Sequence, residues 1–131
     1  MGVSVGWYRG RKDVICYTFD GTWDWDEVHA RREWVLQQMA ESEQKISVIV
    51  NLRGTRHVPP NVVMHLRAIA RTTPPNHSGK SIFVTPGVIV AIYEKVLRQL
   101  SPNLLKRHQL FFVARLEEAE HVLELDRGTH A

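Results

Sequence analysis

A short basic segment in the middle of the chain carries the residues best suited to bind another molecule. Arg53, Arg56 and His57 follow a β-branched apolar run and precede Pro60, a residue well suited to the opening turn of a helix. A helix N-terminus presents free N–H groups and the positive end of the helix dipole, so it attracts anions. The predicted partner- or anion-binding residues are Arg53, Thr55, Arg56, His57 and Asn61. A solvated basic face is the favoured interpretation of these charges, and if they bind a partner, that partner should carry an acidic surface or a phosphate group.

No residue pattern elsewhere in the chain is typical of an enzyme. Gly79-Lys80-Ser81 resembles the end of a phosphate-binding loop, but Pro74 stands where the opening glycine should be, and Lys80 enters a predicted strand. The seven histidines show no paired ligand spacing, and Cys16 is the single cysteine. The carboxylates concentrate on predicted helix surfaces, where the helix dipole and solvation account for them. We therefore predict a protein that is not an enzyme, with no catalytic residues, no metal and no cofactor.

The composition indicates a single soluble domain. A chain of 131 residues that is 44% hydrophobic and 24% charged can bury one core but not two. We assign one domain to residues 1–131, with its core at about residues 5–125. The net charge of +3 is too small to indicate nucleic acid as a partner. No stretch reaches the roughly 18 apolar residues of a membrane span, and the N-terminus lacks the apolar core of a secretion signal. We expect a cytoplasmic protein that binds neither nucleic acid nor a membrane.

Strands and helices are expected to alternate around the basic segment. The strands are predicted at Val5–Arg9, Asp13–Phe19, Ile46–Arg53, Ser81–Thr85 and Leu110–Ala114. The helices are predicted at Asp24–Ser42, from Pro60 to a stop at Pro74, from Pro86 to Leu100, and at Leu116–Leu125. The order β-β-α-β-α-β-α-β-α predicts an α/β fold: a mostly parallel five-stranded sheet with an N-terminal antiparallel edge strand and four helices.

Two features fix the centre of this arrangement. Val48, Ile49 and Val50 stand in succession, which is typical of a central strand that is covered on both faces. The first helix has a marked start, because Asp24 can cap its first turn and Glu27 stands three residues later, as in a capping box.

Aromatic side chains concentrate toward the N-terminus. They are Trp7, Tyr8, Tyr17, Trp23 and Trp25. Burial in the core is the favoured interpretation, and an interface is the alternative because a two-stranded edge cannot hide all of them.

The order and apolar pattern of these elements resemble a STAS domain, the fold of the bacterial anti-sigma-factor antagonists. The resemblance rests on the hairpin, the Asp-rich first helix, the strands Ile46–Arg53 and Ile82–Thr85, the proline-led helix and the closing run Phe112–Ala119. It covers roughly residues 5 to 125 and implies a non-catalytic, regulatory protein–protein interaction module.

The resemblance also implies where a regulatory phosphosite should lie, and this chain departs from it. In the family, a partner kinase phosphorylates a serine or threonine at the start of the helix after the central strand. Here that neighbourhood is Val58–Val62, which has no hydroxyl, and Thr55 is the nearest candidate. We therefore expect no phosphorylation switch at the family position.

Three functions stay open at this point. The first is a module that docks an acidic protein surface through Arg53–Asn61 and the following helix. The second is a domain that binds a small hydrophobic or anionic ligand, lipid-like or nucleotide, because STAS-like folds are related in architecture to lipid-binding domains. The third is an enzyme, which the missing constellations disfavour. A homodimer is an open alternative for the assembly.

Overall fold

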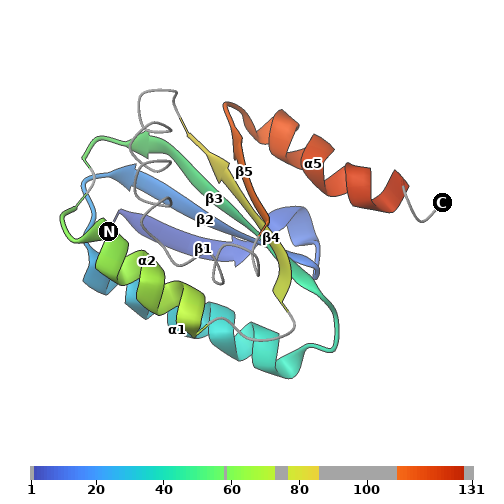
Figure 1. Cartoon of the computed structure of the whole chain (residues 1–131), viewed down its shortest axis with the longest axis horizontal. Helices are drawn as coiled ribbons and strands as arrows, with labels where there is room; N and C mark the ends of the chain where they lie inside the picture. Colours follow the sequence, from blue (N-terminus) through green and yellow to red (C-terminus); the bar gives the residue numbers. More distant parts are fainter. Residues whose placement is uncertain (1, 58, 73–76, 86–108, 129–131) are drawn as a thin grey trace.

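Five strands form one mixed sheet, in which their spatial order is the same as their order along the chain (Figure 1). The computed structural model describes residues 2–57, 59–72, 77–85 and 109–128. The strands are β1 (Val3–Trp7), β2 (Val14–Gly21), β3 (Ile46–Thr55), β4 (His77–Val84) and β5 (Gln109–Val113). β1 runs antiparallel to β2, and the other three neighbouring pairs are parallel. This is the predicted α/β class, with the antiparallel strand at the N-terminal edge.

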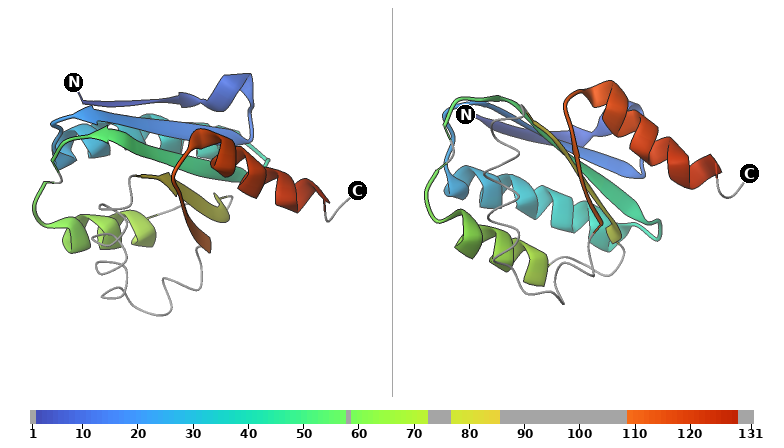
Figure 2. Two further views of the ribbon diagram at one scale, coloured as in Figure 1. Left: turned by 90° about the horizontal axis from the view of Figure 1, so that it is seen from above. Right: turned by 45° about the horizontal axis from the view of Figure 1, so that its top comes forward.

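Helices cover both faces of the sheet. α1 (Trp25–Glu41) and α2 (Val62–Arg71) lie on one face, and α5 (Leu116–Gly128) lies on the other (Figure 2). These are the three α-helices of the described residues, against four predicted. The helix expected from Pro86 to Leu100 lies outside the described residues. None of the described helices is long and apolar enough to cross a membrane.

β3 is the central strand, as its apolar run predicts. Ile46, Val48 and Leu52 are buried in the cluster under α1 and α2, whereas Ile49 is buried in the cluster under α5. Alternate residues of a strand point to opposite faces, so the strand contributes to both cores. Val50 is only partly buried, so the strand is not completely covered on both faces as predicted.

The start of α1 forms as predicted and also fastens the first strand. The Asp24 side chain accepts a hydrogen bond from the backbone N–H of Glu27 at 2.9 Å. The Glu27 carboxylate accepts a hydrogen bond from the N–H of Gly2 at 2.8 Å, which joins the first turn of the helix to the start of β1. Trp23 and Val28 are both buried in the same cluster.

The strand boundaries differ from the prediction by up to four residues, most at β4, which begins at His77 and not at Ser81. Two of the differences have a visible cause. β1 ends at Trp7, because Tyr8–Gly10 form a 3-10 turn in which Arg9 has a positive φ of 49°. β3 continues to Thr55, because Gly54 and Thr55 pair with Asp20 and Gly21 of β2. A Cβ at position 54 would lie 2.7 Å from the Asp20 Oδ1 atom and 2.9 Å from the Phe19 carbonyl oxygen, so glycine permits this close approach.

Candidate functional site

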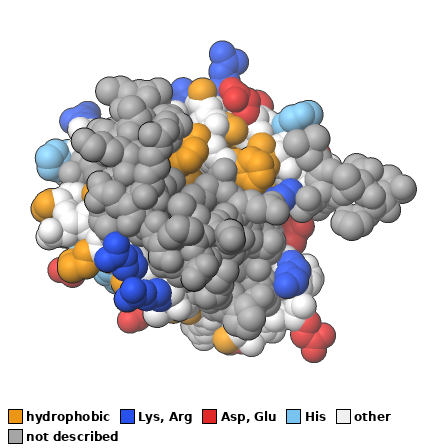
Figure 3. Space-filling view, viewed as in Figure 1, with side chains coloured by type: hydrophobic (Ala, Val, Ile, Leu, Met, Phe, Trp, Pro, Cys, Tyr) orange, Lys and Arg blue, Asp and Glu red, His pale blue; other side chains and the backbone are white. Residues whose placement is uncertain are grey.

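The predicted binding residues lie where the carboxyl end of β3 passes into α2. Arg53, the last residue of the predicted strand, lies in β3, and Thr55, expected in the following loop, belongs to β3 as well. Arg56, His57 and Asn61 follow in the connection to α2. The carboxyl ends of parallel strands are where ligands of open α/β sheets commonly bind. The side chains of Arg53, Arg56 and His57, which we call the basic segment, are all exposed. Figure 3 shows basic and hydrophobic side chains side by side over the region of α2.

Two buried tryptophans hold this connection in place. The indole N–H of Trp23 donates to the Thr55 hydroxyl at 3.3 Å, and that of Trp25 donates to the Pro60 carbonyl at 2.7 Å. The backbone N–H of Arg56 donates to the Gly21 carbonyl at 3.0 Å. Both tryptophans are buried, so for them the core interpretation is confirmed. Their indole N–H groups anchor the Thr55 side chain before Arg56 and the Pro60 backbone after His57.

The N-terminus of α2 differs from the prediction. The helix begins at Val62, so Pro60 precedes the N-cap and does not occupy the first turn. Asn61 is the N-cap residue, with a left-handed φ of 66°, a conformation that asparagine tolerates better than most residues. Its side chain makes no capping hydrogen bond. The exposed Asn61 amide is therefore not committed to the end of the helix.

An exposed apolar side chain follows the basic segment in the first turn of α2. Met64, in the first turn of α2, is 58% exposed and is the large hydrophobic residue most clearly directed to solvent in the described part of the chain. Ala68, one turn later, is also exposed. Methionine adapts its shape to a partner, and interface centres are enriched in methionine and arginine.

A pair of histidines joins α1 to α2, and the sequence analysis did not foresee it. His29 Nε2 lies 2.8 Å from His65 Nδ1, and the His65 ring stacks on Trp25 with their centroids 4.6 Å apart. Burial and the neighbouring His29 lower the pKa of His65, and Asp26 opposes this shift. The two residues are 36 positions apart, so helical spacing carries no signal for the contact. Within the described ranges no group of three or more side chains could hold a metal ion.

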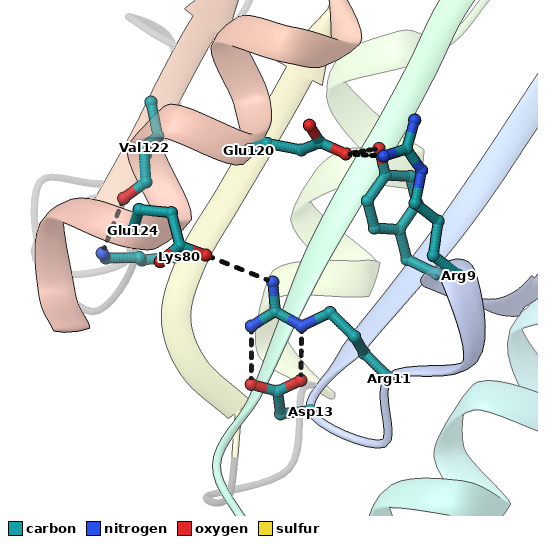
Figure 4. A network of polar contacts seen from close by, with 8 residues as sticks. Arg9, Arg11, Asp13, Lys80, Glu120, Val122 and Glu124 are labelled. Carbon is teal, nitrogen blue, oxygen red and sulfur yellow. Dashed lines mark hydrogen bonds and ion pairs between the residues drawn. The ribbon is translucent and has the colours of Figure 1, made fainter.

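A polar network on the opposite face joins Arg9 and Arg11 to Glu120 and Glu124 of α5 (Figure 4). The Tyr8 hydroxyl donates to Glu120 at 2.7 Å, and Arg9 forms an ion pair with the same carboxylate at 2.6 Å. Burial, followed by the hydrogen bond to Glu120, raises the pKa of Tyr8 to about 12. Arg11 holds Asp13 through two hydrogen bonds of 3.0 and 2.9 Å. These contacts fasten the turn after β1 to α5.

Lys80 has a structural position. It lies within β4, is 5% exposed, and donates from Nζ to the Val122 carbonyl of α5 at 3.3 Å. A lysine that is enclosed between a strand and a helix cannot reach over a bound phosphate. The phosphate-loop interpretation, already disfavoured by Pro74, has no support in this geometry.

In comparisons with known proteins, no protein-family model, curated protein or solved structure matches the chain.

Proposed function

We propose that the protein is a non-catalytic interaction module of STAS-like architecture that docks an acidic protein surface through the basic segment and the first turn of α2. The observation that carries this proposal is the combination of three exposed basic side chains with the exposed Met64 at the start of the next helix. The cations give long-range attraction to an acidic partner, and the methionine supplies the apolar centre that a stable contact needs.

The anchoring of the segment supports the same function. Binding costs free energy whenever loops and side chains must be ordered at the interface. Here the Arg56 N–H and the Pro60 carbonyl are already hydrogen-bonded to Gly21 and Trp25, and the Thr55 hydroxyl is hydrogen-bonded to Trp23. The partner therefore needs to order only the exposed side chains.

The proposed module acts without a phosphorylation switch at the start of α2. Pro60 and Asn61 occupy that position and offer no hydroxyl group. Thr55 is partly buried, and its hydroxyl oxygen accepts the indole N–H of Trp23. A phosphate on Thr55 would displace this contact, so we propose that Thr55 stays unmodified.

A small-molecule carrier is the weaker candidate. A hollow of about 600 Å3 lies between β1 and α1, lined in part by Glu27 and Arg31. It is open to solvent and carries charges of both signs, whereas sites for hydrophobic ligands enclose most of the ligand surface. The hollow does not favour a lipid-like ligand.

The test is an affinity capture from extract of the native cells, with mass spectrometry of the retained proteins. Three baits are compared: the wild type, Arg53→Ala with Arg56→Ala, and a control with Lys12→Ala and Lys45→Ala. Lys12 and Lys45 are exposed and precede β2 and β3, so the control loses the same charge at the opposite end of the parallel strands. We expect an acidic protein that the wild type and the control retain and the arginine variant loses. Identical retention by all three baits would remove the basic segment from the interface.

A further inference from the structure

The outer edge of β1 presents backbone groups that β2 does not use. In the described residues β1 has one neighbour, β2, and forms the end of the sheet. The Asp20 N–H donates to the Gly2 carbonyl at 2.7 Å, so Gly2 and Asp20 are a hydrogen-bonded pair of the antiparallel ladder. Such pairs alternate with pairs that exchange no hydrogen bonds. Val3 and Val5 therefore direct their N–H and C=O groups away from β2, toward the open edge.

One face of α1 lies beside this open edge. It carries four residues spaced three or four positions apart, which places them on the same side of the helix. They line a hollow of about 600 Å3 together with β1, and the lining residues are Val3, Ser4, Val5, Glu27, Ala30, Arg31 and Trp34. A strand added beside β1 would lie over this face and direct alternate side chains toward α1. We call this hollow and the open edge of β1 the edge groove.

Arg31 lies level with the middle of β1. At one end of the edge groove the Glu27 carboxylate accepts a hydrogen bond from the Gly2 N–H at 2.8 Å. At the other end the Trp34 ring meets the Trp7 ring, with their centroids 5.8 Å apart. The helix and the strand therefore run in the same direction, and Arg31 lies about midway between these two contacts. The residue of an added strand that pairs with the middle of β1 would face Arg31.

The charges of the edge groove favour an acidic occupant. Arg31 is exposed and has no hydrogen-bond or ion-pair partner among the described residues. Glu27, the acidic residue of the lining, is already engaged by the N–H of Gly2. At the far end the Lys12 ammonium lies 5.2 Å from the centre of the Trp7 ring. An acidic side chain in the middle of the groove would therefore be attracted by Arg31 and, from farther away, by Lys12.

The same charges disfavour a second copy of this chain as the occupant. Antiparallel pairing of β1 with β1 about a two-fold axis at Val5 would bring the two Arg31 side chains together, because Arg31 lies level with that axis. The sequence of β1, Val3–Trp7, also has no acidic residue that could meet Arg31. A foreign strand that supplies a carboxylate meets neither difficulty.

We propose that the edge groove binds an extended acidic segment of another protein, which joins the sheet as an antiparallel strand beside β1. The segment has an acidic residue at the position that pairs with Val5 and apolar residues two positions before and after it. The open backbone edge supplies affinity, while Arg31 and the apolar Ala30 and Trp34 select the side chains. Antiparallel pairing is the more stable arrangement for a single added strand.

This site is separate from the basic segment. Figure 2 shows β1 at one edge of the sheet and α2 on the side away from it. The two proposals are tested by different variants, so the failure of either one leaves the other standing.

Fluorescence anisotropy of labelled heptapeptides with the full-length chain tests the proposal. The acidic probe is Thr-Val-Thr-Glu-Thr-Val-Thr, and the basic probe has lysine in place of glutamate. Two further forms of the acidic probe carry N-methyl groups. In the inward form they are on the glutamate and both valines, whose N–H groups would face β1. In the outward form they are on the two threonines beside the glutamate, whose N–H groups would face solvent.

We expect the wild type to bind the acidic probe with a dissociation constant below about 1 mM, and at least about fivefold more tightly than the basic probe. Arg31→Glu should reverse this preference. The inward N-methyl form should lose binding, and the outward form should keep it. Arg115→Glu is the matched control and should behave like the wild type, because exposed Arg115 follows β5 at the opposite edge of the sheet.

Four results would overturn the proposal. The first is equal binding of the acidic and basic probes by the wild type, or no binding of either up to about 1 mM. The second is an unchanged preference in Arg31→Glu, and the third is an inward N-methyl form that binds as well as the outward form. The fourth is a wild type that dimerises through β1 and excludes the acidic probe. Loss of the acidic probe by Arg53→Ala with Arg56→Ala, but not by Arg31→Glu, would place the probe on the basic segment and would also overturn it.

Discussion

Replacing Trp25 by phenylalanine should destabilise the protein more than the same change at Trp23. Both side chains are buried, at 8% and 6% exposure. Trp25 donates at 2.7 Å to the Pro60 carbonyl, a backbone group that has no freedom to turn away. Trp23 donates at 3.3 Å to the Thr55 hydroxyl, which can rotate to another partner. The pair therefore compares these two hydrogen bonds; Trp25 also stacks on the His65 ring, whereas Trp23 packs edge-on against Phe19.

The magnitudes follow from two contributions. Either substitution exposes or empties a few tens of Å2 of apolar contact, worth about 1 kcal/mol. Trp25→Phe also removes the hydrogen bond to the Pro60 carbonyl, worth about 0.5–1.5 kcal/mol because Pro60 is exposed and water can replace the donor. We expect losses of about 1.5–2.5 kcal/mol for Trp25→Phe and about 1 kcal/mol for Trp23→Phe. For a chain of this size, 1 kcal/mol corresponds to roughly 4 °C in melting temperature.

The assay is urea unfolding of both variants and the wild type, followed by tryptophan fluorescence and circular dichroism. The two probes must give one transition, so that a free energy of unfolding is defined. A Trp25→Phe loss equal to or smaller than the Trp23→Phe loss would refute the reasoning. It would mean that the contact with Pro60 contributes nothing to the folded state.

Further expectations concern the core, acidity and modification. Ile49→Ala should lower the free energy of unfolding in urea by about 3–4 kcal/mol, because Ile49 is 0% exposed. Val50→Ala should lower it by only about 1 kcal/mol, because Val50 is partly exposed. Equal losses for the two variants would contradict this difference in burial. The pKa of His65 is lowered on folding, so the unfolded chain binds more protons near pH 6, and the melting temperature should fall as the pH drops below about 6.5. His65→Gln should flatten that profile, and an unchanged profile would show that the contact with His29 carries no linkage. Mass spectrometry of protein from its native host should find no stoichiometric phosphate on Thr55, and its presence there would reinstate a phosphorylation switch.

The sheet could be predicted because its signals are local. The apolar run from Ile46 indicates a central strand whichever way the rest of the chain folds. The start of α1 is equally local, since Asp24 and the N–H of Glu27 are three residues apart. Such patterns depend on the spacing of apolar residues and on capping residues, both of which can be recognised in the sequence itself.

The parts of the site that depend on tertiary contacts could not be predicted from the sequence. β3 continues through Gly54 because glycine has no Cβ and so tolerates the close approach of Asp20 and Phe19 of β2. No residue near Gly54 in the sequence indicates that approach. Asn61, rather than Pro60, begins α2 with a left-handed backbone. The contact between His29 and His65 depends on how two helices pack on the sheet.

Exposure of Met64 was likewise not foreseen. Helical periodicity places Met64 off the apolar stripe of Val62, Leu66 and Ile69, so its exposure could have been inferred from the sequence.

The most direct test of the account is the salt dependence of partner binding by the wild type, by Arg53→Ala with Arg56→Ala, and by the Lys12→Ala and Lys45→Ala control. Isothermal titration with the captured partner should show at least about tenfold weaker binding for the arginine variant, or about 1.4 kcal/mol, with a shallower salt dependence. The control should bind like the wild type. All three proteins should melt at nearly the same temperature, because exposed charges contribute little to folding. Equal affinities and equal salt dependence for the three proteins would contradict the claim that the basic segment is the docking surface.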